Sequence, residues 1–459
     1  MVDIGKTLSK VSLWSADGRM LDRQVRPNDQ PTVDGLSRLD LDGIANWLLG
    51  ALSNYRGEDI RAIVPVAHGA GVVALDASGP ALPPLDYEQD LPEDVLSAYH
   101  NERAGFAETG SPSLPGGLNM GAQLYWMQLR HPDILAKTTL VPWAQYWAWF
   151  LSGTARSEVT SLGCHSDLWA PQAGHFSSLA NRLNWSNRFA PLAGAGDIIG
   201  RLRSEIAIST GLSAETPVLA GLHDSNAALL AARGFPEIAN NEATVLSTGT
   251  WFVSMRLPAE PIPIGRLSEA RDCLVNVDVE SRAIPSARFM GGREIESLIE
   301  LDTRRVDIKP DQPALMAAVP GILEQRAMVL PSLASGTGPY PNMQRRRINW
   351  PEDWYARRAT ACIYAALVAD TSLDLIGSRE HLLVEGRFAE AEVFVRALAA
   401  LRPNTKVFVA NAHNDVGLGA LRLIDPDLSA AGELRRVEPL EGDLAGYRKE
   451  WRDEIEVFA

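Results

Sequence analysis

Apolar and polar residues alternate over the first part of the chain, and apolar residues then recur at helical spacing. Residues 2–4 and 10–14 have the pattern of strands joined by a turn at 5–7, and Ala16-Asp17-Gly18 is typical of a hairpin turn into a further strand at 19–25. Leucine, isoleucine and alanine repeat at helical spacing from 41 to 52, which predicts an amphipathic helix. The chain therefore opens with strands joined by tight turns, followed by a helix.

A strand pattern returns after this helix. Residues 60–66 are mostly apolar, which predicts a strand buried on both faces. The turn His68-Gly69-Ala70-Gly71 then leads into a strand at 72–75. These elements predict a mixed sheet with helices in the first half of the chain.

The strand–turn–strand pattern recurs near residue 243. Strands are predicted at 243–246 and 251–255 around the small-residue turn Ser247-Thr248-Gly249-Thr250. A helix at 353–376 precedes a β-α-β unit, with strands at 381–384 and 406–409 and a helix at 389–401. The recurrence predicts two like-built domains, 1–223 and 224–459, each a mixed α/β sheet flanked by helices, with a ligand cleft between them.

Composition narrows the functional classes. A chain of 459 residues is too long for a single hydrophobic core, so two or more domains are expected. The net charge of −14 argues against nucleic acid as a partner. The three cysteines are far apart and form no CxxC pair, which argues against a disulfide framework or a cysteine-zinc site. The start lacks the pattern of a secretion signal, and the longest apolar-aromatic stretch, 140–151, is too short to span a bilayer. We therefore expect a cytoplasmic protein without a membrane partner.

The first candidate for chemistry is Asp224, in Gly221-Leu222-His223-Asp224-Ser225-Asn226. The alanine-leucine block at 227–232 predicts a helix that stops near Gly234, so Asp224 lies at the helix start. Capping alone accounts for many acids at that position. A catalytic role therefore needs further support.

That support comes from two small turns. Asp3-Ile4-Gly5-Lys6-Thr7 places an acid at a strand end beside a turn whose N–H groups can face phosphate oxygens, while the acid holds Mg²⁺ through water. Ser247-Thr248-Gly249-Thr250 repeats this arrangement in the second half. Either turn alone is ordinary turn chemistry. Two at corresponding places predict a clamp on a triphosphate.

Six segments, in order, resemble the motifs of the FGGY carbohydrate kinases, a family of the actin-like ATPase superfamily. They are residues 3–18 (first phosphate motif), 66–79 (sugar-binding hairpin), 160–168 (substrate side of the first domain), 221–227 (catalytic acid), 247–251 (second phosphate motif) and 331–339 (a proline-bounded loop). The resemblance runs nearly end to end. It implies two actin-like, ribonuclease H-like domains that bind ATP and Mg²⁺ and phosphorylate a small sugar or polyol.

The resemblance also implies roles for individual residues. Asp224 would be the general base, for which an ordinary Asp pKa suffices because positioning and charge neutralisation do most of the work in phosphoryl transfer. Asp3 would be the acid on the metal side. The implied nucleotide-binding residues are Lys6, Thr7, Thr248, Gly249, Thr250, Gly292 and Gly386. For the sugar we expect His68, Asn119, Asp224 and Ser225.

The chain departs from the family pattern in three places. Lys6 adds a charge to the first phosphate turn, Glu385 replaces the first of two paired glycines before Gly386, and Glu390 replaces a small polar residue. The two glutamates leave open a non-catalytic sugar- or nucleotide-binding regulator on the same fold. A filament-forming or chaperone relative of actin fits less well, because His223-Asp224 beside a sugar-binding hairpin is foreign to those proteins.

The sugar itself is left open. The run at 84–88 lacks the Trp and Arg of pentulose kinases and is nearest to kinases of deoxy-ketoses such as rhamnulose or fuculose. The oligomeric state is also open, a homodimer included.

Overall fold

The structure is a computed structural model that describes residues 1–303, 305–334, 336–412 and 416–458. Its contacts divide the chain into two compact units. Unit 1 comprises Met1–Gly234, Val275–Ala283 and the described residues from 416 to 431, and unit 2 comprises Phe235–Leu274 and the described residues of 284–412 and 432–458. These contacts group residues 224–234 with unit 1, while the domain division at 223/224 stays a prediction.

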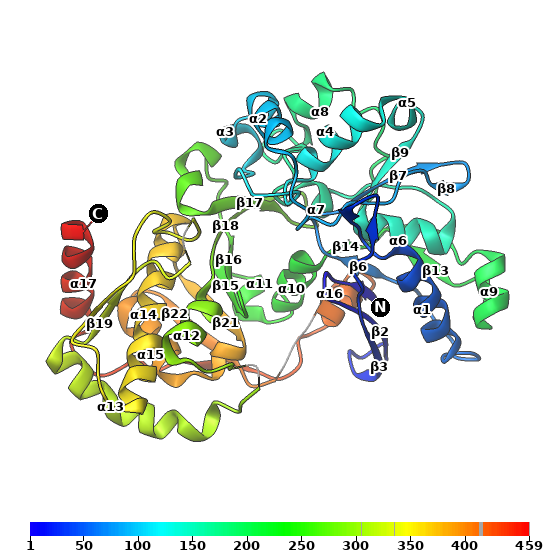
Figure 1. Ribbon diagram of the computed structural model, residues 1–459. Coiled ribbons are helices and arrows are strands. Elements are labelled where there is room, and N and C mark those ends of the chain that lie inside the picture. The colour runs from blue at the N-terminus through cyan, green and yellow to red at the C-terminus, as the bar shows by residue number, and fades with distance from the viewer. Residues whose placement is uncertain (304, 335, 413–415, 459) are drawn as a thin grey trace. The chain divides into compact units, whose positions relative to one another are not determined.

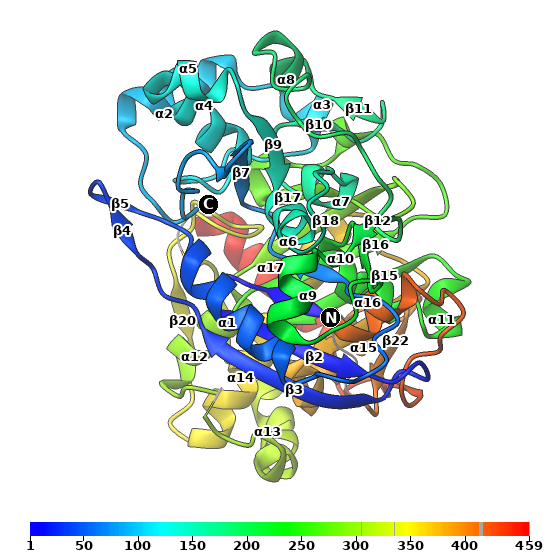
Figure 2. The same ribbon diagram turned by 90° about the vertical axis from the view of Figure 1, so that its right-hand side faces the viewer.

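Unit 1 contains a five-stranded mixed sheet in the order β14-β6-β1-β2-β3. Its strands are β14 (Leu222–His223), β6 (Pro65–Ala67), β1 (Val2–Ile4), β2 (Leu8–Trp14) and β3 (Met20–Pro27). β1, β6 and β14 run parallel, whereas β2 and β3 continue the sheet antiparallel. Figure 2 shows the β2–β3 hairpin beside α1 (Leu41–Ser53), which packs on β2.

The helices of unit 1 bury apolar faces against this sheet. α1 buries Ile44, Leu48 and Leu52, which share one helical face, in a core that also includes Val2 and Ile4 of β1. The aromatic helix α6 (Trp143–Ser152) joins the same core. α10 (Asp224–Ala232) packs against α16 (Val416–Arg422), a contact between segments almost two hundred residues apart in sequence.

A seven-stranded sheet (Figure 1) has the order β17-β18-β16-β15-β21-β22-β23, and it belongs to unit 2 apart from residues 275–277 and 283. Its strands are β17 (Cys273–Val277), β18 (Ala283–Phe289), β16 (Phe252–Leu257), β15 (Ala243–Thr248), β21 (His381–Gly386), β22 (Lys406–Ala410) and β23 (Leu434–Arg436). β15, β21 and β22 are parallel, and β15–β16 is an antiparallel hairpin. The predicted recurrence of a strand–turn–strand element is thus confirmed, since β1–β2 and β15–β16 are both hairpins.

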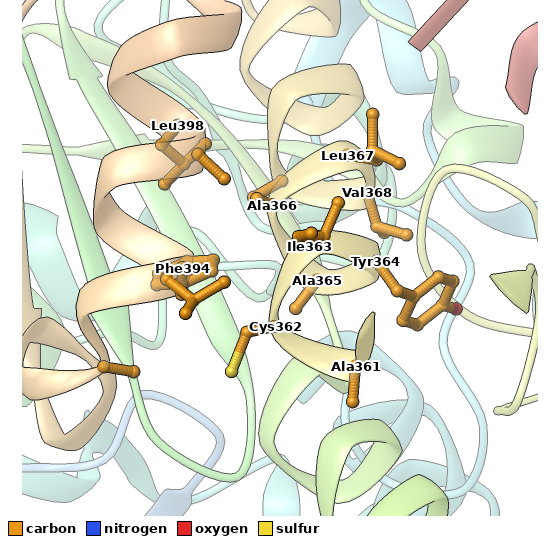
Figure 3. Packing of buried hydrophobic residues seen from close by; sticks show 14 of the residues in the cluster. Ala361, Cys362, Ile363, Tyr364, Ala365, Ala366, Leu367, Val368, Phe394 and Leu398 are labelled. Carbon is orange, nitrogen blue, oxygen red and sulfur yellow. The ribbon is translucent and has the colours of Figure 1, made fainter. Parts of the chain in front are cut away.

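The core of unit 2 forms around α14 (Trp354–Leu375), which is buried along most of its length. It packs against α12 (Gly291–Ile299), α13 (Gln312–Gln325) and α15 (Glu392–Leu401). Figure 3 shows Phe394 and Leu398 of α15 on the side of α14 that carries Cys362, while Tyr364 points away from them. Small residues on α14, such as Ala361 and Ala365, allow this close packing.

The remaining elements complete the two units. In unit 1 they are β4 (Thr32–Val33), β5 (Leu36–Ser37), β7 (Val72–Asp76), β8 (Gly79–Pro80), α2 (Glu93–Glu102), α3 (Phe106–Thr109), α4 (Met120–Arg130), α5 (Pro132–Leu135), β9 (Thr139–Pro142), α7 (Val159–Leu162), β10 (Trp169–Ala170), β11 (His175–Phe176), α8 (Ser178–Arg182), β12 (Ile198–Arg201), α9 (Ser204–Thr210) and β13 (Pro217–Leu219). In unit 2 they are α11 (Pro236–Ala239), β19 (Met328–Leu330), β20 (Arg346–Ile348), α17 (Leu444–Phe458) and four 3₁₀ turns, Ile264–Arg266, Glu269–Arg271, Lys309–Asp311 and Arg387–Glu390.

One predicted strand is misplaced. The apolar run at 60–66 does not form one continuous strand; β6 covers only Pro65–Ala67. Ile63 instead pairs with Val218, and its N–H donates to the carbonyl of Pro217 at 2.8 Å. The apolar run thus contacts three different strands, β1, β14 and β13, and is not one long strand.

Among the described residues, no helix has the length and hydropathy needed to cross a bilayer. All three cysteines are buried and free.

Candidate active site

The carboxyl ends of three parallel strands bring the predicted residues of unit 1 together. Ala67 of β6 pairs with Ile4 of β1 on one side and with His223 of β14 on the other. The residues that follow these strand ends are the first phosphate turn, His68 and Asp224. Side chains after parallel strands converge at one sheet edge, which is where ligands usually bind in such sheets. The register therefore places the predicted phosphate turn, imidazole and acid at one edge.

Asp224 is the first residue of α10 and does not act as its N-cap. The N-cap is His223, which makes no side-chain capping bond. The Asp224 carboxylate lies 3.1 Å from Nε2 of His223 and accepts from the Ser225 hydroxyl at 3.3 Å, and 34% of the side chain is exposed. Capping therefore does not account for this carboxylate.

The protonation state of Asp224 suits a base. Burial raises the pKa of its carboxyl, but the hydrogen bond and charge of His223, together with His68, lower it below the usual Asp value overall. The group is therefore a carboxylate at neutral pH.

His223 is held so that it donates to Asp224. Nδ2 of Asn226 lies 3.3 Å from Nδ1 of His223, which leaves the proton on Nε2, toward the carboxylate. The main-chain N–H of His223 donates to Oγ1 of Thr160 at 3.0 Å, and that hydroxyl donates to Oε2 of Glu158 at 2.5 Å. Sequence reasoning missed Glu158. The signal near it was the family-like segment 160–168, which begins at Thr160.

Glu158 is fully buried. Its Oε2 also accepts from the N–H of Thr160 at 2.9 Å and of Ser161 at 3.2 Å, whereas Oε1 is buried without a hydrogen-bond partner among the described residues. Burial raises the pKa of Glu158 to about 7, although these hydrogen bonds act in the opposite direction. Glu158 is therefore linked, through Thr160, to the main-chain N–H of His223, the residue before Asp224.

His68 presents two unsatisfied nitrogens. Its ring lies edge-on to Tyr87 at 5.2 Å and tilted against Trp143 at 5.9 Å, and both Nδ1 and Nε2 are buried without a hydrogen-bond partner in the described part of the chain. Burial lowers the pKa of His68 to about 4, so the ring is neutral at physiological pH. Buried polar atoms without partners are rare in folded proteins. A neutral imidazole in this state offers one donor and one acceptor to a ligand hydroxyl.

Gly69 is required next to His68. A Cβ at this position would lie 1.9 Å from Sγ of Cys164 and 3.0 Å from the ring of His223. Only glycine allows Cys164 and His223 to approach the hairpin this closely.

Asn119 differs from the expected sugar ligand. It is 2% exposed, and its Nδ2 donates to the carbonyls of Pro112 at 3.0 Å and His165 at 2.8 Å. Its Oδ1 accepts from the N–H of Leu114 at 2.9 Å. The amide is therefore engaged with main chain, and a sugar-binding role for Asn119 stays a prediction that this geometry does not support.

The first phosphate turn is braced by Asn28. Its Nδ2 donates to the carbonyl of Gly5 at 2.8 Å, and its N–H donates to that of Thr7 at 2.9 Å. The Lys6 ammonium does not stay at the turn, since it bonds to Asp86 and lies 3.5 Å from Glu88. The turn and the lysine charge are thus separated.

Asp3 is nearly buried, and its Oδ2 accepts from Nζ of Lys10 at 2.9 Å. Within the described residues, no group of three or more His, Cys, Asp or Glu side chains could hold a metal ion. Mg²⁺ needs no such cage, because it is usually held by one or two carboxylates, waters and substrate phosphates. Asp3 fits that kind of outer contact.

The second phosphate turn gathers the remaining predicted residues in unit 2. Thr248 Oγ1 donates to the carbonyl of Glu385 at 2.6 Å and accepts from the N–H of Phe388 at 3.0 Å. A Cβ on Gly292 would lie 2.0 Å from the carbonyl O of Gly249, and one on Gly386 (φ 82°) would lie 2.4 Å from that of Thr248. Two glycines thus pack directly on the main chain of the turn that ends at Thr250.

Glu385 occupies a place beside this turn. Its carboxyl accepts a hydrogen bond from the Ser247 hydroxyl, and burial raises its pKa to about 6. Glu390 instead pairs with Lys309 at 2.9 Å on the surface. Of the two glutamates that depart from the family pattern, only Glu385 lies at the second phosphate turn.

Comparison with known proteins agrees with this arrangement. Residues 1–231 match the FGGY family of carbohydrate kinases, N-terminal domain, and residues 240–431 match carbohydrate kinase FGGY, C-terminal domain. A carbohydrate kinase from Novosphingobium aromaticivorans is 64% identical over 99% of this chain and 98% of its own, with a TM-score of 0.97. No curated protein sequence matches.

More distant structures share the fold. A xylulose kinase from Rhodospirillum rubrum is 17% identical, with coverages of 100% and 97% and a TM-score of 0.77. Plasmodium falciparum glycerol kinase with ADP is 12% identical, with coverages of 100% and 97% and a TM-score of 0.80. Together with the family matches, the shared fold confirms two actin-like domains of mixed sheet and helices, and neither of these two structures is a rhamnulose or fuculose kinase. The chain belongs to the FGGY family of carbohydrate kinases.

Proposed function

We propose that this carbohydrate kinase transfers the γ-phosphoryl group of ATP to a hydroxyl of a neutral sugar or polyol, with Asp224 as the general base. The observation that carries this proposal is the ionised, partly exposed Asp224 carboxylate at the same sheet edge as His68. Unlike a capping acid, it has lone pairs free for a ligand hydroxyl. His68 supplies the second polar contact.

In the reaction, the sugar hydroxyl oxygen forms a bond to the γ-phosphorus while the bond from that phosphorus to the ADP oxygen breaks. Asp224 accepts the hydroxyl proton and later releases it to solvent. Its low pKa is no obstacle, because the proton is largely taken late in a loose transition state. His223, oriented by Asn226, keeps the carboxylate aimed and ionised.

Nucleotide binding is proposed at the two turns. The N–H groups of the turn at Lys6 and Thr7 face one set of phosphate oxygens, and Thr248, Gly249 and Thr250 face another. Gly292 and Gly386, which pack on the main chain of the second turn, are proposed to lie at the nucleoside end. Mg²⁺ would be held by the phosphates and, through water, by Asp3, and it would neutralise charge that develops on the phosphates.

The acceptor is proposed to be uncharged. His68 is neutral, Asp224 is negative, and the Lys6 ammonium is already paired with Asp86. No free cation therefore faces the acceptor among these residues, which disfavours sugar acids. Within the neutral sugars we propose deoxy-ketoses of the rhamnulose and fuculose type, on the sequence at 84–88.

The test is a coupled ADP-release screen over ketoses, deoxy-ketoses, polyols and aldonic acids, followed by Asp224→Asn on the sugar found. We expect turnover to fall by at least about a thousandfold while calorimetry shows Mg·ATP affinity nearly unchanged. Asp133→Asn, an exposed acid of unit 1, is the matched control and should keep full activity. Undiminished phosphorylation by Asp224→Asn would sink the assignment of the base.

The same calorimetry separates the kinase from a regulator. The carboxyl of Glu385 at the second phosphate turn is the observation that favours a regulator. Absence of nucleotide binding at millimolar ATP with Mg²⁺ would support that reading and overturn the kinase.

A further inference from the structure

The side chain of Lys6 extends from the first phosphate turn to the loop that follows β8. Its Nζ bonds to Asp86, lies 3.5 Å from Oε2 of Glu88 and sits 4.8 Å over the ring of Tyr87. Only 11% of the Lys6 side chain is exposed. The positive charge that Lys6 adds to the family pattern is therefore neutralised by acidic residues of unit 1.

The burial of Asp86 makes the loss of this ion pair energetically costly. The Asp86 side chain is 2% exposed, with Oδ1 accepting from the N–H of Glu88 at 2.8 Å and Oδ2 accepting weakly from the hydroxyl of Ser37 at 3.4 Å. If Lys6 turned to a phosphate, it would leave a buried carboxylate without its cation. The ammonium is thus committed to the loop.

The loop leads directly to the acceptor site. Tyr87 follows Asp86, and its ring meets His68 edge-on at 5.2 Å, with an interplanar angle of 76°. Lys6 pairs with Asp86 and covers the face of Tyr87. Fixing Tyr87 in turn fixes the ring of His68, whose nitrogens await a ligand.

The main chain of the turn is left for phosphate. Asn28 holds the carbonyls of Gly5 and Thr7, while the N–H groups of Lys6 and Thr7 have no hydrogen-bond partner in the described portion of the chain. A turn with free N–H groups binds anions without a lysine side chain.

We propose that Lys6 is a positioning residue of the sugar site, acting through Asp86 and Tyr87, and is not a phosphate ligand. This rests on the proposed function, and it replaces the nucleotide role that the sequence predicts for the Lys6 side chain. The backbone of Lys6 belongs to the phosphate turn, whereas its ammonium contacts Asp86 and Tyr87 beside His68. One residue therefore links the proposed phosphate site to the proposed sugar site.

The experiment measures steady-state kinetics with the sugar found in the screen, and calorimetric Mg·ATP affinity without sugar. Lys6→Met is expected to raise the sugar KM by about tenfold or more, with the ATP dissociation constant within about twofold of wild type. Asp86→Asn should act alike, and the Lys6→Met/Asp86→Asn double variant should be no worse than the poorer single variant. Lys6→Arg, which keeps the ion pair, should restore most of the loss.

Two controls separate the role of Lys6 from general effects of charge and folding. Lys137→Met removes an exposed lysine charge from unit 1 and should change neither constant. The double variant leaves no unpaired buried charge, so it folds even where a single variant is unstable. A tenfold weaker ATP affinity in Lys6→Met with an unchanged sugar KM would overturn the proposal. If no sugar is phosphorylated, the proposed function fails, and the ATP affinity of Lys6→Met still decides the role of Lys6.

Discussion

The charge state of Glu158 is coupled to the free energy of unfolding of the protein. Glu158 is fully buried, and its folded-state pKa is about 7, compared with 4.5 for an ordinary Glu. Between these values the folded protein keeps a proton that the unfolded chain has lost. The contribution of Glu158 to stability therefore falls as pH rises from about 4.5 to about 7.

Glu158→Gln tests this coupling, because glutamine has a similar shape and is neutral at every pH. The free energy of unfolding of wild type, relative to this variant, is expected to drop by about 3 kcal/mol between about pH 5 and pH 8. Urea unfolding at both pH values measures it. Glu93→Gln, an exposed acid of α2, should follow wild type. If the curves of wild type and Glu158→Gln run parallel, Glu158 is ionised in the folded protein and the idea fails.

At the scale of elements, the contact between α10 and α16 holds the helix that begins with Asp224. A Cβ on Gly419 of α16 would lie 1.8 Å from the carbonyl O of Ala227 in α10, so the two backbones touch. Gly419→Ala must push the helices apart and is expected to cost about 1–3 kcal/mol of stability. Chemical denaturation of the full chain measures this loss.

Gly50 is the matched control for Gly419. It is also a helical glycine of unit 1, but a Cβ there would meet nothing within 4 Å. Gly50→Ala should therefore stabilise the protein, by about 0.5–1 kcal/mol, because alanine is the better helix former. Equal effects of the two substitutions would show that the α10–α16 contact is loose, against the geometry.

Which elements the sequence predicts depends on how local their determinants are. The hairpins at β1–β2 and β15–β16 and the helix α14 follow from periodicity, turn residues and the cap at Asp353, all within a short stretch. The run at 60–66 was predicted as one strand because its three partners, β1, β14 and β13, are distant in sequence. Local pattern does not reveal which strand a residue meets.

The same limit applies to the site. His68 and Asp224 lie in recognisable motifs, but the chain from Glu158 through Thr160 to His223 joins residues more than sixty positions apart. Similarly, the sequence gives Lys6 a charge near phosphate, whereas its partner Asp86 is eighty residues away. Residue types indicate which chemistry is available, but only the folded structure shows which residues contact one another.

At the scale of the whole molecule, the proposed groups divide between the units. Asp224, His68 and the first phosphate turn belong to unit 1, whereas Thr248–Thr250 and Gly292 belong to unit 2. Variants of Asp224 in unit 1 and of Gly292 in unit 2 should therefore separate catalysis from nucleotide binding. A ligand that binds only the folded state stabilises it by an amount set by its affinity, about 2.7 kcal/mol at a hundred times the dissociation constant.

Gly292→Ala puts a methyl group 2.0 Å from the carbonyl O of Gly249 and must displace the second phosphate turn. We expect Mg·ATP to raise the melting temperature of wild type and of Asp224→Asn alike, but to raise that of Gly292→Ala far less, because its nucleotide affinity is weakened by about tenfold or more. Gly321→Ala is the control in unit 2, since a Cβ there meets nothing within 4 Å, and it should keep the full shift. If Asp224→Asn lost the nucleotide shift as well, the acid would be needed to bind ATP, and its assignment as a base acting on the sugar hydroxyl would have to be withdrawn.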